Sequence, residues 1–391
     1  MSSSNLVSVT MLKEVTAGTT PPAPAPFETM RFTSESLNGA AETIASEELN
    51  PSRASAGVIN VGLTVNGDIN AEFSPSPIYK ELILSAMMSP SWTAAVSSTA
   101  ASYVVDNVAK TITGAGDDLT TIFTVGSTVK LDTGFVANQG KAVYISAVTP
   151  TVVTYVGELV DETAATGVLK SPESVGIGGG ANTTVHSYTL SKQFLDLVNK
   201  SLTYRGSTVN TWSMAYEWGQ IIQTVFGFVG LGWEVPALPV TDGRTINPAT
   251  TQAPLNGSSQ VGTILINNQD LNLCFSSLNI ALNNNDRSNQ CIGRLSSTSV
   301  TPGQAQIDVT ASLYLGDNSW EFIQKKITNE SVSLYVVASS AEGGIAILIP
   351  ALTVPGTNDP LASGPNTDVM LELVASARQP ATGNLMTVYW L

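Results

Sequence analysis

One unusually long stretch of alternating residues constrains the fold of this chain more than any other feature. Between Asn60 and Phe73, apolar and polar side chains occupy alternate positions. Successive side chains of a β-strand point to opposite faces of a sheet, so the pattern predicts a strand with one buried and one wet face. The apolar positions are Val61, Leu63, Val65, Ile69, Ala71 and Phe73, and the polar ones are Asn60, Thr64, Asn66, Asp68, Asn70 and Glu72.

The dipeptide Asn66-Gly67 within this stretch leaves two interpretations open. Asn-Gly is typical of the two-residue type I′ turn of a hairpin. The alternation, however, runs through the dipeptide without a change of parity, which is compatible with one continuous strand. Such a strand would span about 46 Å at about 3.3 Å per residue, which few compact domains need.

A capped helix is predicted directly after the alternating stretch. Ser76 is the expected N-cap, Pro77 lies in the first turn, and the apolar residues near one face extend to Met87. The residue order therefore predicts a wet-faced strand followed at once by a short helix.

The same order returns late in the chain. Positions 304–313 alternate again, and a second helical segment covers residues 320–327, with Asp317 or Asn318 as its expected cap. We interpret the repeated order as an internal duplication, although few residues are identical between the two halves. The chain, at 391 residues, is also longer than one ordinary β-sandwich domain.

The predicted fold class is all-β with short flanking helices, built as a duplicated β-sandwich with a small inserted β domain. Short strands at even spacing indicate the insertion, and proline-rich or glycine-rich segments mark the boundaries. The predicted parts are an extended N-terminal arm at 1–27, a first sandwich at 28–96 and 181–235, the inserted domain at 97–180, a linker at 236–260 and a second sandwich at 261–391.

The composition argues against a protein that binds specific nucleic-acid sequences and against a membrane protein. The formal net charge of −14 repels a phosphate backbone, although the same repulsion suits a conduit through which DNA slides. No run of about 18 apolar residues or signal peptide is visible, so we expect synthesis and folding in the cytoplasm. The two cysteines, Cys274 and Cys291, lie in strand-like runs and are expected to be buried thiols.

The sequence predicts no catalytic residue, no metal ligand set and no cofactor. His186 is the single histidine and is expected to be structural, and the glycine-rich run 176–180 reads as a hinge because no lysine follows it. The acidic residues Glu42, Glu47 and Glu48 are interpreted as solvated surface or channel lining.

An aromatic series at every second position leaves one binding hypothesis open. Trp212, Tyr216 and Trp218, with Met214 among them, could form a sugar-binding platform. A role in the core or in a subunit contact is favoured, because methionine interrupts the aromatic surface and packed sheets need such bulk.

The order of these motifs resembles the tail tube proteins, or major tail proteins, of long-tailed, siphovirus-type bacteriophages. The alternating strand with Gly67-Asp68-Ile69 and the capped helix are part of the resemblance, which covers most of the chain outside the inserted domain. The other motifs are Phe32 to Leu37, Glu42 to Glu48, Ser187 to Phe194, Tyr204 to Asn210 and Phe226 to Gly230.

The resemblance implies a structural virion protein of the phage tail without enzymatic residues. Sandwich hairpins would join around a ring into an inner β-barrel, and stacked rings would form a hollow tube that conducts DNA during ejection. Two sandwiches per chain favour a ring of three chains with pseudo-sixfold symmetry over a hexamer. The implied partners are further copies of the chain, the tail terminator, the tape measure and distal tail proteins, with non-specific passage of double-stranded DNA and no membrane.

Seven residues are predicted to face the channel of such a tube. A closed barrel removes sheet edges and needs strands with one apolar and one wet face, which both alternating segments provide. Alternatives are another phage component, such as a baseplate or decoration protein, and a β-rich surface adhesin or carbohydrate-binding module. The predicted channel-facing residues are Asn66, Asp68, Asn70, Glu72, Gln306, Asp308 and Thr310.

Overall fold

The computed structural model describes residues 3–48, 57–177, 183–361 and 364–391. Strands dominate the described residues, and α1 (Pro77–Ala86) and α2 (Trp320–Thr328) are their two α-helices, with short 3-10 turns at Ser4–Leu6 and Leu119–Thr121. The predicted all-β class with short helices is confirmed. Within the described residues, neither helix has the length and apolar character needed to cross a membrane.

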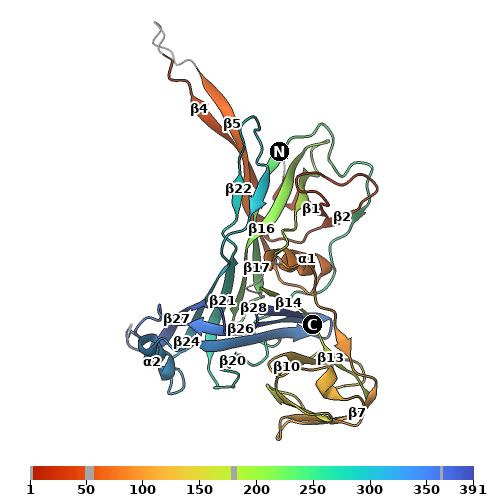
Figure 1. Cartoon of the computed structure of the whole chain (residues 1–391), viewed down its shortest axis with the longest axis vertical. Helices are drawn as coiled ribbons and strands as arrows, with labels where there is room; N and C mark the ends of the chain where they lie inside the picture. Colours follow the sequence, from red (N-terminus) through yellow and green to blue (C-terminus); the bar gives the residue numbers. More distant parts are fainter. Residues whose placement is uncertain (1–2, 49–56, 178–182, 362–363) are drawn as a thin grey trace.

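The molecule is elongated, with a long hairpin at one end and a separate small sheet at the other (Figure 1). Most strands belong to the main body. Those preceding the second helix are β1 (Val7–Lys13), β2 (Phe27–Thr29), β3 (Ser34–Glu35), β4 (Asn38–Ala45), β5 (Val58–Glu72), β14 (Glu173–Ile177), β15 (Tyr188–Phe194), β16 (Ser201–Glu217), β17 (Gln223–Gly230), β18 (Gly232–Glu234), β19 (Ile246–Asn247), β20 (Leu265–Ile266), β21 (Phe275–Asn283) and β24 (Gln306–Tyr314). Those following it are β25 (Val332–Ser340), β26 (Gly343–Thr353), β27 (Met370–Ala377) and β28 (Met386–Trp390).

The central sheet places strands from distant parts of the chain side by side. Its antiparallel order is β4-β5-β17-β16-β21-β24-β27. The pairs β5–β17 and β16–β21 join strands that are not consecutive in the chain, so they are long-range contacts. They combine both alternating segments in one sheet.

The alternating stretch of the sequence forms one strand rather than a hairpin. β5 continues through Gly67, which has a φ of 135° and lies in the strand, not in a turn. A β-carbon at this position would approach the Ser36 carbonyl oxygen to 2.4 Å. Glycine is needed here because the conformation and the close approach of the edge segment both exclude a side chain.

A continuous hydrophobic core lies behind the central sheet. The buried face of the sheet packs against α1 and against outer strands, among them β15 and β25. Tyr79 of α1 is fully buried and stacks on Phe226 of β17, with 6.0 Å between ring centroids. The apolar side of the amphipathic strands is thereby covered.

The inserted region forms a separate eight-stranded sheet with its own core. Tyr103, Ile112, Val129 and Val153 are among the buried residues of that core. The strands are β6 (Val96–Ser97), β7 (Ala101–Asp106), β8 (Thr111–Gly114), β9 (Thr128–Leu131), β10 (Ala142–Val148), β11 (Val152–Val156), β12 (Glu162–Gly167) and β13 (Leu169–Ser171).

The return from this sheet differs from the expected boundary. β14, which the sequence placed inside the insertion, pairs with β28 of the main body instead. Residues 178–180 of the predicted glycine hinge lie outside the described residues, and the overall division into domains remains a prediction.

The segment predicted as an extended N-terminal arm contributes a strand to the body. β1 pairs with β15 over its whole length, and Val9 and Met11 are buried. The proline-rich part dominated the prediction because proline cannot join a ladder, but Val7–Lys13 precedes it and carries β-branched residues. The arm prediction is wrong for these residues.

Two smaller predictions also need correction. The N-cap of α2 is Ser319 rather than Asp317 or Asn318, since the chain turns one residue later than the sequence indicates. Cys274 and Cys291 are free and exposed, because both lie outside the strands that were expected to bury them.

Candidate functional site

A polar surface runs across six neighbouring strands of the central sheet. The side chains of each strand alternate between the core and this opposite surface, which we call the polar face. It consists of Asn66, Asp68, Asn70 and Glu72 of β5; Gln223, Val225, Gly227 and Val229 of β17; Thr211, Ser213, Ala215 and Glu217 of β16; Ser277, Asn279, Ala281 and Asn283 of β21; Gln306, Asp308, Thr310 and Ser312 of β24; and Met370, Glu372, Val374 and Ser376 of β27.

All seven residues singled out in the sequence lie on the polar face. The strand register places the β5 group and the β24 group in the same cross-strand rows. One such row runs from Asn70 through Val225, Ser213 and Ala281 to Asp308. Four of the seven are exposed (Asn66, Asp68, Gln306 and Thr310), and three are half-buried (Asn70, Glu72 and Asp308).

The polar face carries negative charge only. Its ionisable groups are the carboxylates of Asp68, Glu72, Glu217, Asp308 and Glu372. All six strands lie within the described residues, and none of the polar-face positions holds a lysine or arginine. A phosphate backbone beside this surface would therefore find no cation with which to pair.

Short hydrogen bonds fix several side chains of the face. Asp308 accepts from Gln306 Nε2 at 2.7 Å and from Ser376 Oγ at 2.6 Å. Ser312 Oγ donates to Glu372 Oε1 at 2.8 Å on the same strand pair. Two of the five carboxylates are thus held in place by neighbouring hydroxyl or amide groups, and the surface is preorganised.

Close packing across the face depends on a glycine. A β-carbon on Gly227 would lie 2.1 Å from Thr211 Oγ1 and 2.7 Å from Asp68 Oδ1. Gly227 stands between these two residues in one cross-strand row. Its missing side chain leaves room for both neighbours.

Most of the aromatic series lies on the opposite, core-facing side of the same sheet. Trp212 and Tyr216 are 2% and 4% exposed, and Met214 lies buried between them. Trp212 Nε1 donates to Thr224 Oγ1 at 3.1 Å. The favoured interpretation as core is confirmed for these residues, whereas Trp218 is 78% exposed because it follows the last residue of β16.

The central sheet has an edge at each end. On the β5 side, the chain before β4 bonds to β5 through the amides of Thr33 and Ser36. On the β27 side, the chain leaving β26 follows β27, and the Asn358 amide donates to the Glu372 carbonyl at 3.1 Å. The outer side of each edge segment carries no ladder partner among the described residues.

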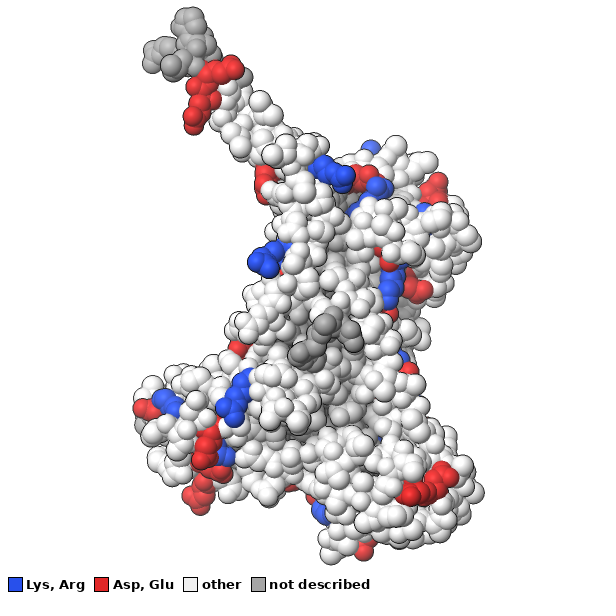
Figure 2. Space-filling model, in the orientation of Figure 1, with Lys and Arg blue, Asp and Glu red and all other residues white. Residues whose placement is uncertain are grey.

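The remaining sequence candidates lie in separate parts of the chain. His186 is buried, with its Nε2 atom 2.7 Å from the Ser89 carbonyl oxygen. Glu42, Glu47 and Glu48 are exposed on or beside β4, where acidic side chains gather near the end of the hairpin (Figure 2). Among the described residues, no three His, Cys, Asp or Glu side chains approach closely enough to hold a metal ion.

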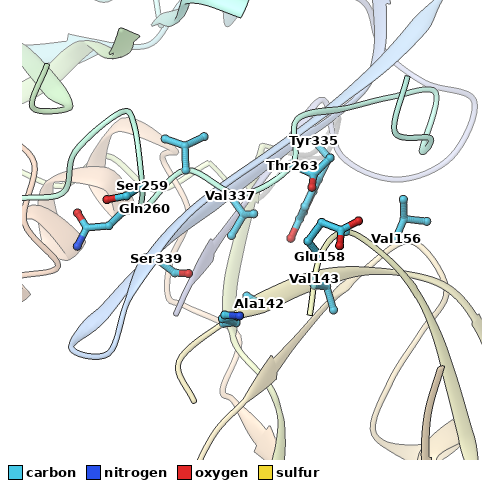
Figure 3. Close-up of a pocket in the computed structure, with 14 residues that line it drawn as sticks. Ala142, Val143, Val156, Glu158, Ser259, Gln260, Thr263, Tyr335, Val337 and Ser339 are labelled. Atoms are coloured by element: carbon cyan, nitrogen blue, oxygen red, sulfur yellow. The ribbon is translucent and has the colours of Figure 1, made fainter. Parts of the chain in front are cut away.

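A pocket of about 260 Å³ lies between the inserted sheet and β25 (Figure 3). Tyr335 and Val337 line one side, and Val143, Val156 and Glu158 line the other. Hydrogen bonds from its neighbours Lys110 and Asn107 lower the pKa of Glu158. These contacts within the inserted domain favour the ionised form of the carboxyl group.

The sequence did not indicate that four further strands share this face, namely the three between the two alternating segments and β27 beyond the second one. β16, β17, β21 and β27 supply most of the polar face, yet Val225, Val229, Ala215 and Ala281 interrupt the polar pattern.

Comparison with known proteins assigns the chain to a family. A family model described as phage tail tube protein matches residues 4–377. No individual curated protein matches the sequence. The match spans the central sheet, both helices and the inserted sheet, so this chain belongs to the phage tail tube protein family and is a structural protein of the virion tail.

Proposed function

We propose that copies of this chain join edge to edge into rings, and that stacked rings form a tube whose channel is lined by the polar face. The observation that carries the proposal is the pairing of β16 with β21 inside one chain. This junction joins the two halves of the central sheet. The same junction, repeated between copies, would close the sheet into a barrel without edges.

The two halves of the sheet supply equivalent strands for such a repeat. β5 is followed by α1 and β24 by α2, as the duplication predicts. Pairing of β5 with β17 corresponds to pairing of β24 with β27, with Ile69 opposite Phe226 and Val309 opposite Ala375. The second half therefore resembles the first in the order of its strands and helix and in the register of its strand pairs.

The correspondence identifies the residues at the proposed junction. In the chain, Thr211 lies opposite Asn283. Thr353 is the equivalent of Thr211, because Thr353 pairs with Ser376 as Thr211 pairs with Gly227. Asn38 is the equivalent of Asn283, because Asn38 pairs with Asn66 as Asn283 pairs with Gln306. We therefore expect Thr353 of one copy to lie opposite Asn38 of the next.

Three copies complete the ring in this proposal. Each copy contributes two related sets of strands, so three copies give pseudo-sixfold symmetry. The acidic, cation-free polar face would then surround passing double-stranded DNA and leave it mobile. The tail terminator and distal tail proteins would meet the tube at its ends, and the tape measure would occupy the channel during assembly.

The β4–β5 hairpin suits contact between stacked rings. It projects from the body (Figure 1), and its paired residues Ile44 and Ile59 are 61% and 65% exposed. Two large aliphatic side chains opposite each other on a projecting hairpin leave apolar area that association would bury. The contact would run head to tail, because the hairpin stands at one end only.

A disulfide experiment tests the ring junction and counts its copies. In a Cys274→Ser, Cys291→Ser background, Asn38→Cys and Thr353→Cys are combined and the protein is assembled and oxidised. Ladder partners lie about 4.5–5.5 Å apart at their Cα atoms, within disulfide range. Denaturing electrophoresis should resolve covalent products of up to three chains.

The single-cysteine variants are the matched controls and should give no product beyond two chains. Products of up to six chains would replace the trimeric ring by a hexamer. Assembled tubes without any Asn38–Thr353 crosslink would refute the junction. Micrographs of the same samples establish that tubes are present.

A further inference from the structure

The inserted sheet is buried on a side that faces away from its own core. In β10, Val143 and Ile145 point into that core, whereas Ala142 and Tyr144 point outward. Nevertheless Ala142 and Tyr144 are only 6% and 4% exposed. An apolar run without alternation is typical of a strand covered on both faces, and here the second cover is the main body.

The body presents a matching apolar surface. β25 and β28 turn Tyr335, Val337, Tyr389 and Leu391 away from the main core and toward the inserted sheet. All four are less than 9% exposed. The inserted sheet shields these apolar side chains from solvent.

Directional contacts fix how the two surfaces meet. The rings of Tyr144 and Tyr335 meet edge to face, with 5.4 Å between their centroids. The Tyr335 hydroxyl lies 3.1 Å from Thr128 Oγ1 of β9, so its polar atom has a partner in the interface. Figure 3 shows Tyr335 and Val337 of β25 close to Ala142 and Val143 of β10.

The connections to the inserted sheet are also attached to the second half. Thr93 and Ser174, one on each connection, exchange backbone hydrogen bonds of 2.8 and 3.2 Å. Trp92 packs edge-on against Trp390 of β28 at 6.1 Å, and β14 pairs with β28. An insertion that leaves and rejoins the first half of the chain is therefore anchored on the second half.

The outer surface of the first half has a different cover. In β15, Thr189 and Ser191 occupy buried positions beside the N-terminal segment. Thr189 Oγ1 donates to Glu14 Oε1 at 2.7 Å. Residues before β2 thus cover the first half and make polar contacts with it.

We infer that the inserted domain is a fixed bracket between the first half of the chain, into which it is inserted, and the second half, on which it docks, rather than a mobile appendage. Its docking surface is formed by Ala142 and Tyr144 on one side and by Tyr335 and Val337 on the other. This docking lies within a single chain and does not depend on tube formation.

Distance measurement between spin labels tests the bracket in the full-length protein. One label is placed on native Cys291 and the other on Val125→Cys in the inserted domain, in a Cys274→Ser background; both positions are exposed. Labelled protein is diluted with unlabelled protein so that only distances within one chain contribute. A narrow distance distribution is expected.

Two variants and one control define the outcome. Ala142→Arg and Val337→Arg place a charge in the interface from opposite sides and should broaden the distribution. Ser146→Arg adds the same side chain at an exposed position of β10 and should leave it narrow. Hydrogen exchange at Ile112 and Val153 reports whether the inserted core remains folded.

A broad distribution in the parent protein would overturn the inference. So would a narrow distribution in either interface variant while the inserted core stays protected. If Ala142→Arg unfolds the inserted sheet, the distance distribution of Val337→Arg is the test of the inference, because Val337 belongs to the main body.

Discussion

Ser376 donates a hydrogen bond to Asp308 across the pairing of β24 with β27, with 2.6 Å between Ser376 Oγ and Asp308 Oδ1. Gln306 donates to the other oxygen of the same carboxylate. Both donors lie on the polar face and neither carries a charge. The Asp308 carboxylate is thus oriented without being neutralised, and the negative charge of this surface persists.

Reversing this charge should convert a passive surface into one that binds DNA. We expect tubes of the Asp68→Lys, Asp308→Lys protein to retain duplex DNA, because each lysine can displace a phosphate counterion. The logarithm of the binding constant should fall more steeply with the logarithm of salt concentration, by about 0.9 for each phosphate contacted. Cosedimentation of labelled duplex with assembled tubes measures both effects.

The Asp68→Asn, Asp308→Asn protein is the control for that experiment. It removes the same two negative charges without adding cations, so strong retention of DNA is not expected. Equal retention by the asparagine and lysine proteins, or retention by neither, would contradict a channel position for these residues.

Gly227 should tolerate no side chain while Thr211 and Asp68 retain theirs. The β-carbon of Gly227→Ala would overlap Thr211 Oγ1, at 2.1 Å. Overpacking of this kind costs about 1–3 kcal/mol of unfolding free energy. Urea denaturation should show the loss, and adding Thr211→Gly should restore part of it. A Gly227→Ala protein as stable as its parent would show that the strands can separate without cost.

Two tryptophans of neighbouring sequence should respond oppositely to truncation. Trp212→Ala removes a core side chain that is 2% exposed, at a cost of about 3–5 kcal/mol. Trp218→Ala removes one that is 78% exposed and should change stability by less than about 0.5 kcal/mol. Chemical denaturation of both proteins checks the difference. Unchanged stability with loss of glycan binding in Trp212→Ala would instead favour a carbohydrate-binding module.

The projecting hairpin offers a test of ring stacking that is separate from folding. Ile59→Asp places a charge on its exposed aliphatic pair and should prevent formation of long tubes, leaving the monomer folded. Asn60→Asp adds the same charge at the adjacent exposed position and should permit assembly. Tube length in micrographs and circular dichroism of the monomer separate the two effects. Normal tubes from Ile59→Asp would exclude this pair from the stacking contact.

The sequence revealed those features that depend on local periodicity. The wet-faced strand, the helix after Ser76 and the core position of Trp212 follow from the spacing of apolar residues. The parity argument through Gly67 was the correct guide, and the turn propensity of Asn-Gly was not. Burial on the core side outweighed the local turn preference.

Features set by long-range pairing were not visible in the sequence. Nothing in β17 indicates that Phe226 lies opposite Ile69, because strand pairing between distant segments depends on the whole fold. The sequence likewise did not indicate that an inserted sheet covers Tyr335. The position of β1 was missed because the proline-rich segment after it suggested an extended arm.

Asp286 should make stability depend on pH. It follows the central sheet at the base of the β22–β23 hairpin (Arg287–Asn289 and Ser299–Thr301), and both its carboxylate oxygens are buried without a hydrogen-bond partner among the described residues. Loss of water around the carboxylate raises its pKa from 3.8 to about 7. The folded state therefore binds a proton that the unfolded state has already lost between these values.

The sign of the effect follows from this difference in proton binding. The free energy of unfolding should decrease as pH rises from about 4 to about 7, because ionisation is easier in the unfolded chain. Asp286→Asn has no ionisable group at this position, so the parent should lose stability relative to this variant over the same range. Urea midpoints of both proteins at several pH values measure the difference. A difference that is constant with pH would mean that the Asp286 carboxyl group is solvated in the folded protein.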